Sequence, residues 1–210
     1  MGSTKSKRKK QGKRLIVTKW TLFFLLPIGT RVCIIPLRRL LQMNDFLNLY
    51  PTTELEDWVS NLYINKVKIL RPSEIDELNI ASYYGIFLSK RYISPSHLIL
   101  GRYIGITVDK RDSPEVQRED FFHELCHVLR HSGIQTMMPN AFRELQEWDA
   151  RNFVRYAAIP HHMLRFIDFN DTNVINNMSE MFKVTPELCE ERLNYIKRRI
   201  ALYGKELIRK

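Results

Sequence analysis

The chain has 210 residues, 33 of them Lys or Arg and 23 Asp or Glu, which gives a formal net charge of +10. A hydrophobic fraction of 44% supports a packed core and excludes a chain that is disordered throughout, while three scattered cysteines exclude a disulfide framework and favour a reducing, cytoplasmic compartment. The basic excess lies in residues 1–42, which hold 11 basic residues and no acid. Residues 43–210 carry 22 basic against 23 acidic residues, and this nearly neutral body does not predict strong nucleic-acid binding.

We expect two parts: an N-terminal extension, residues 1–42, and a single domain, residues 43–210. The extension consists of a basic run, 5–14, followed by an apolar stretch that Pro27 interrupts. A transmembrane helix needs about 20 apolar residues, so this stretch is a poor candidate. We favour a start codon assigned too early, with translation beginning at Met43 and the extension outside the working protein.

The alternative for the extension is a tail that associates with a membrane. A basic run beside apolar residues can lie on an anionic lipid surface. Gly2 and Ser6 also fit the short N-myristoylation pattern. Membrane contact is therefore expected only if residues 1–42 belong to the mature protein.

The pattern of the body predicts an α+β fold with a small antiparallel or mixed sheet. In chain order it predicts a helix from the capping box Thr53–Glu56, a helix from Ser73 to Gly85, strands at 86–93 and 103–108, and helices at 114–131, 140–157 and 185–203. Ser-Pro and Gly residues between the two strands indicate a turn region. Residues 170–210 form a helical C-terminal subregion.

The helix predicted at 114–131 contains His123-Glu124-Leu125-Cys126-His127. A spacing of four places both histidines on one helical face, where they can reach a single zinc ion at about 2.0–2.1 Å. Glu124 lies on the adjacent flank, where its carboxylate can take a proton from a water beside the ion. This pattern predicts a metallopeptidase site with one zinc ion and Glu124 as the general base.

A catalytic zinc site needs a third protein ligand, and the next helix offers Glu144 and Glu147. Glu147 is followed three residues later by Ala150, a small residue that lets this helix pack closely on the zinc helix. Glu144 lies one turn earlier and would face solvent. We therefore favour Glu147 as the third ligand.

The two helices together resemble the ImmA/IrrE family of zinc metallopeptidases. The segment FFHELCHVLRHSG is followed by EWDARNFVRYAAIP, in which Glu147, Ala150, Phe153 and Pro160 match the family's second helix. The resemblance runs from about Thr52 to the last helix. It implies a zincin-like fold and supports Glu147 as the third ligand.

Thermolysin-like enzymes often place a carboxylate four residues after this glutamate, where it orients a ligand histidine. Arg151 stands at that position here. The orienting group is therefore expected elsewhere, in Asp149, Asn152 or a backbone carbonyl.

The resemblance also implies a substrate. Members of this family commonly lie in mobile elements or phage-like islands, where they cleave a neighbouring helix-turn-helix repressor and so act as anti-repressors. Two alternatives stay open: a non-proteolytic zincin-fold protein that regulates through protein contacts, and a metallopeptidase anchored to a membrane by residues 1–42.

Several other residues near the motif carry weaker expectations. His131 either contacts substrate or, as we favour, interacts with the dipole at the helix end. Cys126 is expected in the core, His97 in an exposed turn, and His161 and His162 on the surface.

Two longer segments also carry expectations. By analogy with zinc peptidases, the strand at 103–108 is a candidate edge strand for substrate. Residues 181–200 resemble part of a helix-turn-helix, although a closing helical hairpin is the simpler interpretation.

Overall fold

The structure is a computed structural model, and it describes residues 23–28, 31–36, 50–131 and 138–209. The chain divides into two compact units, Met1–Asp45 and Phe46–Lys210. In the first unit, strands β1 (Phe23–Ile28) and β2 (Arg31–Pro36) form an antiparallel pair. The basic run, the myristoylation pattern and Met43 lie outside the described residues. Within the described ranges, no helix is both long and apolar enough to cross a membrane.

The second unit contains a three-stranded mixed sheet in the order β3-β5-β4, which confirms the predicted fold class. Strand β5 (Tyr103–Asp109) is central, with β3 (Phe87–Arg91) parallel on one side and β4 (Ser96–Leu100) antiparallel on the other. Two expectations were therefore wrong. The segment 103–108 is not an edge strand, and the presumed turn region contains β4.

Strand β4 is short and lies between turn residues, so the local signal is that of a turn. Gly101 has a φ of +60°, a left-handed conformation that glycine adopts without strain and that suits the tight turn joining β4 to β5. Along β4, His97 and Ile99 point to the face that carries Leu88 and Ile106, according to the strand registers.

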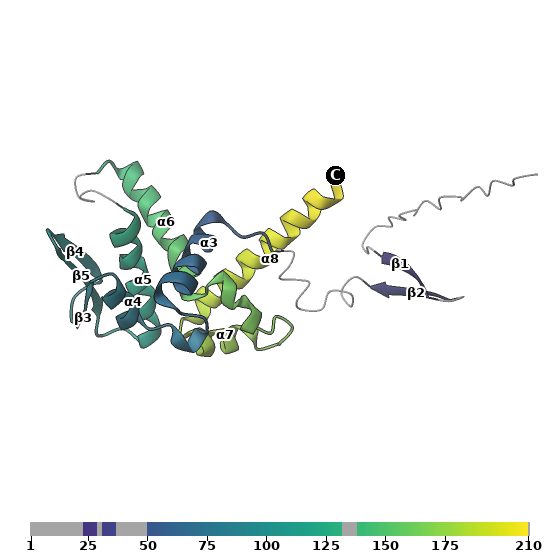
Figure 1. Cartoon of the computed structure of the whole chain (residues 1–210), viewed down its shortest axis with the longest axis horizontal. Helices are drawn as coiled ribbons and strands as arrows, with labels where there is room; N and C mark the ends of the chain where they lie inside the picture. Colours follow the sequence, from purple (N-terminus) through teal and green to yellow (C-terminus); the bar gives the residue numbers. More distant parts are fainter. Residues whose placement is uncertain (1–22, 29–30, 37–49, 132–137, 210) are drawn as a thin grey trace, which may run out of the picture. The chain divides into compact units, whose positions relative to one another are not determined.

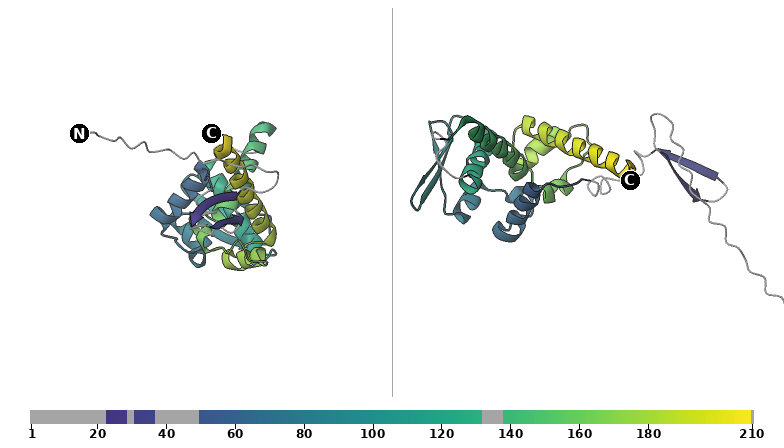
Figure 2. Two further views of the ribbon diagram at one scale, coloured as in Figure 1. Left: turned by 90° about the vertical axis from the view of Figure 1, so that its right-hand side faces the viewer. Right: turned by 90° about the horizontal axis from the view of Figure 1, so that it is seen from above.

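Two long helices follow the sheet in the chain and carry the His-Glu-x-x-His motif and Glu147; the first of them packs against the sheet (Figures 1 and 2). Helix α5 (Pro114–Arg130) begins as predicted, because the Ser113 side chain accepts a hydrogen bond from the Val116 N–H and Pro114 occupies the first turn. Helix α6 (Asn140–Ala158) lies against α5 and buries Ala150 and Phe153.

The helices ahead of the sheet show where local cues succeed and where they mislead. Helix α3 (Glu54–Asn61) begins at the predicted capping box and continues as a π-helical segment, Leu62–Val67. The next helix does not begin at Ser73, because Pro72–Glu74 form a 3-10 turn whose Glu74 carboxylate accepts the N–H groups of residues 70 and 71. Helix α4 (Glu77–Tyr83) is instead capped by Asp76.

The C-terminal part is a 3-10 segment, His161–Phe166, followed by helices α7 (Val174–Phe182) and α8 (Pro186–Arg209). Helix α8 extends beyond the predicted end near residue 203, and Figures 1 and 2 place it at the opposite end of this unit from the sheet.

The interpretation of 181–200 as a DNA-contacting motif is not supported, because two of its basic side chains are used internally. Arg192 is fully buried and its Nη1 lies 2.7 Å from the Glu56 carboxylate, which also accepts the Tyr50 hydroxyl at 2.5 Å. Arg199 donates to the carbonyl oxygens of Pro51 and Thr52. These contacts bind residues 50–56 to helix α8.

Candidate metal and catalytic site

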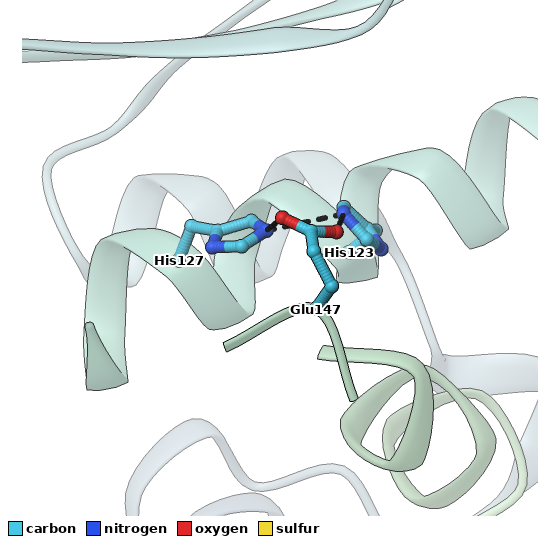
Figure 3. Close-up of side chains that lie close together, drawn as sticks. All are labelled: His123, His127 and Glu147. Atoms are coloured by element: carbon cyan, nitrogen blue, oxygen red, sulfur yellow. Dashed lines mark hydrogen bonds and ion pairs between the residues drawn. The ribbon is translucent and has the colours of Figure 1, made fainter. Parts of the chain in front are cut away.

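Helix α5 presents His123 and His127 on one face, as the spacing predicts (Figure 3). The opposite face of the same helical turns is embedded in the core, with Phe122, Leu125 and Cys126 almost fully buried. The His127 side chain is only 3% exposed, whereas that of His123 is 29% exposed. The site is therefore closed on one side by the core and open on the other.

Glu147 reaches the two histidines from α6 (Figure 3). Its Oε2 lies 3.2 Å from His123 Nε2, its Oε1 lies 3.3 Å from His127 Nε2, and the two Nε2 atoms are 3.1 Å apart. Atoms that bind one zinc ion tetrahedrally at about 2.0–2.1 Å lie about 3.3 Å from one another. The three side chains thus fit the donor set and the spacing of a three-ligand zinc site.

The protonation of His127 also suits a metal ligand. Burial is the main cause that lowers the pKa of its imidazole, to about 4, although the nearby Glu147 acts in the opposite direction. The ring is therefore neutral near neutral pH, and a neutral imidazole has the lone pair that metal binding requires.

Glu124 lies beside the two histidines and is held by a residue that the sequence did not indicate. Its side chain is 11% exposed, and its Oε2 lies 2.6 Å from Nδ1 of His97 on strand β4. The His97 ring also stacks on that of His127, with centroids 5.3 Å apart and planes 15° from parallel. The expectation of an exposed turn histidine was wrong, because the residue lies on the helix-facing side of a strand.

A second chain of contacts extends from His127 to α6. His131 Nδ1 lies 2.9 Å from His127 Nδ1, and His131 Nε2 lies 3.1 Å from Asp149 Oδ2. Arg130 donates to both Asp149 oxygens. Burial alone would raise the pKa of Asp149, but the hydrogen bonds and charge of Arg130 outweigh it and hold that pKa below its usual value.

These contacts agree with one arrangement of protons. When His127 keeps a lone pair on Nε2, its Nδ1 donates to His131 Nδ1, and His131 Nε2 then donates to Asp149. His131 is thus more than a helix-end histidine, since its ring joins the candidate ligand to Asp149. Asn152, the other candidate for an orienting role, instead donates to the Trp148 carbonyl and accepts from Arg155.

Cys126, His131 and Asp149 form a second convergent trio, but its chemistry suits a metal poorly. Burial raises the pKa of the Cys126 thiol well above its usual value, and metals bind the thiolate. Asp149 is already neutralised by Arg130. We therefore assign Cys126 to the core, where it is fully buried, as the sequence suggested.

The remaining sequence candidates lie apart from the three convergent side chains. Glu144 is exposed on α6, one turn before Glu147. His161 and His162 are half-buried rather than on the surface: the His161 ring lies tilted against that of Tyr50, with centroids 5.8 Å apart, and His162 Nε2 lies 3.2 Å from the Ile69 carbonyl. Burial lowers the pKa of both rings, and both serve packing.

Comparison with known proteins gives a consistent result. Residues 88–194 match the family model Peptidase M78, described as the IrrE N-terminal-like domain. The chain is 33% identical over 153 residues to Bacillus subtilis (strain 168) YqaB, which is named an uncharacterized protein, covering 72% of this chain and 88% of the relative. It is 34% identical over 161 residues to the phage-like element PBSX protein XkdA of the same organism, covering 76% and 78%. No solved structure matches the chain.

Proposed function

Because the chain belongs to the IrrE N-terminal-like family of peptidases, whose members are generally metal-dependent, we propose that it is a zinc-dependent endopeptidase that cleaves a helix-turn-helix repressor. The observation that carries this proposal is the convergence of the Nε2 atoms of His123 and His127 with the Glu147 carboxylate, at separations of 3.1–3.3 Å, beside the carboxylate of Glu124.

The roles follow from the geometry. His123, His127 and Glu147 would hold one zinc ion, which would lower the pKa of a bound water and polarise the carbonyl of the scissile bond. Glu124, whose Oε2 is held by His97, lies beside the two histidines and is placed to accept a proton from the attacking water. The same carboxyl then donates that proton to the departing amine nitrogen, so that the base is restored.

The substrate backbone binds in extended form along β4. Among the described strands, β4 pairs only with β5, so its other edge presents backbone N–H and C=O groups. A peptide that adds to this edge as a further strand satisfies them. The edge lies directly beside the site, because β4 carries the residue that contacts Glu124.

Two observations support a repressor as the substrate. One relative, XkdA, is by its name a protein of a phage-like element. The sequence also resembles the ImmA/IrrE family, in which such enzymes cut a neighbouring repressor. The cellular effect would then be derepression of the element that encodes the enzyme.

Co-expression with each helix-turn-helix protein encoded near this gene tests the proposal. The wild-type chain should produce one defined cut, and Glu124→Gln should abolish it while zinc content, measured by atomic absorption, stays at one ion per chain. Cleavage that persists in Glu124→Gln would refute the assignment of the base. Derepression by Glu124→Gln without any cut would instead favour a non-proteolytic regulator.

A further inference from the structure

We infer that His97 is a positioning residue that holds the general base in register with the substrate-binding strand. The inference rests on the proposed function, and it concerns a residue outside the two motif helices. His97 lies 27 positions before Glu124 in the sequence, and the fold brings its Nδ1 within 2.6 Å of Glu124 Oε2.

The contact is partly shielded from solvent, which strengthens it. The His97 side chain is 24% exposed and that of Glu124 only 11%. A hydrogen bond to an ionised acceptor in such surroundings is stronger than one between neutral groups.

The direction of the hydrogen bond follows from the role of the base. A carboxylate ready to take a proton can only accept hydrogen bonds, so His97 Nδ1 carries the hydrogen and donates it to Oε2. Oε2 is thereby engaged, and Oε1 is the oxygen left to meet the attacking water. A glutamate side chain has three rotatable bonds, and this contact removes much of their freedom before the substrate binds.

The His97 ring is itself fixed from two sides. Its plane stacks nearly parallel on His127, and its backbone is paired with Ile106 in the antiparallel register of β4 and β5. His97 therefore connects three parts of the site that must be aligned for catalysis. It belongs to the edge strand that receives the peptide, it contacts the carboxylate that takes the proton, and its ring stacks on one of the proposed zinc ligands. Any displacement of β4 would move Glu124 Oε2 with it.

Four variants separate this role from simple packing. His97→Asn places an amide N–H close to the position of Nδ1, whereas His97→Gln carries its amide one bond further out. His97→Phe keeps the ring but has no donor. Ser96→Ala, whose side chain lies on the other face of the same strand, is the matched control.

The first measurement is steady-state cleavage of the repressor, with zinc content and thermal unfolding recorded for each variant. Loss of an orienting partner typically costs about 10–100-fold. We expect that loss in kcat for His97→Phe and His97→Gln, with KM within about twofold of wild type. His97→Asn should recover to within about fivefold and Ser96→Ala should match wild type. Equal rates for His97→Phe and wild type, or for His97→Asn and His97→Gln, would overturn the inference.

The second measurement does not depend on activity. In chelator-treated protein labelled with ¹⁵N-histidine, the His97 ring N–H should give a slowly exchanging NMR signal that disappears in His97→Phe and in Glu124→Ala but persists in Ser96→Ala. Absence of the signal from wild-type protein would overturn the pairing. A wild-type chain that cleaves nothing while showing this signal would contradict the proposed function and leave the pairing intact.

Discussion

The choice between Glu147 and Glu144 as third zinc ligand gives a sharp test of the site. Both are glutamates of α6, one helical turn apart, and a change to glutamine is nearly isosteric for each. Glu147→Gln replaces a carboxylate that lies 3.2 and 3.3 Å from the two imidazole nitrogens with a neutral amide. Glu144→Gln changes an exposed side chain and serves as the matched control.

The expected loss can be sized from the number of ligands. Apparent free energies of zinc binding at four-ligand sites are about 10–16 kcal/mol at pH 7, or roughly 2.5–4 kcal/mol for each ligand. A loss of that size corresponds to a weakening of about 100–1,000-fold in zinc affinity for Glu147→Gln. Glu144→Gln should remain within about threefold of wild type, because its side chain takes no part in the convergent set.

Competition with a chromophoric chelator, at fixed pH and ionic strength, measures both affinities. Thermal unfolding of the chelator-treated proteins controls for damage to the fold, and both variants should resemble wild type because neither side chain is buried. If Glu144→Gln loses zinc as strongly as Glu147→Gln, or if Glu147→Gln binds zinc like wild type, then the three-ligand reasoning is wrong.

Three further predictions address the surroundings of the site. His131→Phe should weaken zinc binding by about 10–100-fold by removing the partner of His127 Nδ1, and an affinity within threefold of wild type would show that His131 does not orient the ligand. Arg192→Leu should lower the free energy of unfolding in urea by about 3–5 kcal/mol, because it leaves the buried Glu56 carboxylate without its cation; a loss below about 1 kcal/mol would contradict this. Burial, followed by the charge of Asp112, raises the pKa of Asp120 from its usual 3.8 to about 6. An acid whose pKa is higher in the folded state than in the unfolded state destabilises the fold. This destabilisation is absent below about pH 4 and reaches its full size above about pH 6. In chelator-treated protein, Asp120→Asn should therefore stabilise the fold by about 1–2 kcal/mol near pH 8, after allowance for solvent screening, and by nothing near pH 4; equal effects at both pH values would refute it.

Helix starts that are capped by side chains close in the sequence were predictable from the sequence. The capping box at Thr53 and the Ser113-Pro114 start of α5 are contacts between residues three apart or fewer, so the sequence alone contains both partners. The boundary of α4 was not predictable in this way. At Ser73 a similar pattern is present, but Glu74 turns back to the N–H groups of residues 70 and 71 and delays the helix until Asp76.

The candidate ligands also differ in whether nearby residues or distant packing brings them together. His123 and His127 are related by the helical period, and only helix formation is needed to bring them together. Glu147 required the packing of a second helix, and the small residue Ala150 indicated which face of that helix turns inward. The orienting contacts of His131 and Asp149 depend on the rotamers of both helices, and no sequence pattern specifies those.

The contact between His97 and Glu124 could not be predicted from the helical motif alone. A metallopeptidase motif records the residues that one helix holds in a fixed spacing, but the base must also be aligned with a peptide that binds to the sheet. That alignment requires a contact between helix and sheet, and its donor can stand at any strand position that faces the base. In this chain the donor is on the edge strand β4, so the strand proposed to receive the substrate also positions the carboxylate proposed to activate the attacking water. A chain with the same two helices but no donor at this position would need another group to restrain its base, or would leave that carboxylate mobile and lower its kcat.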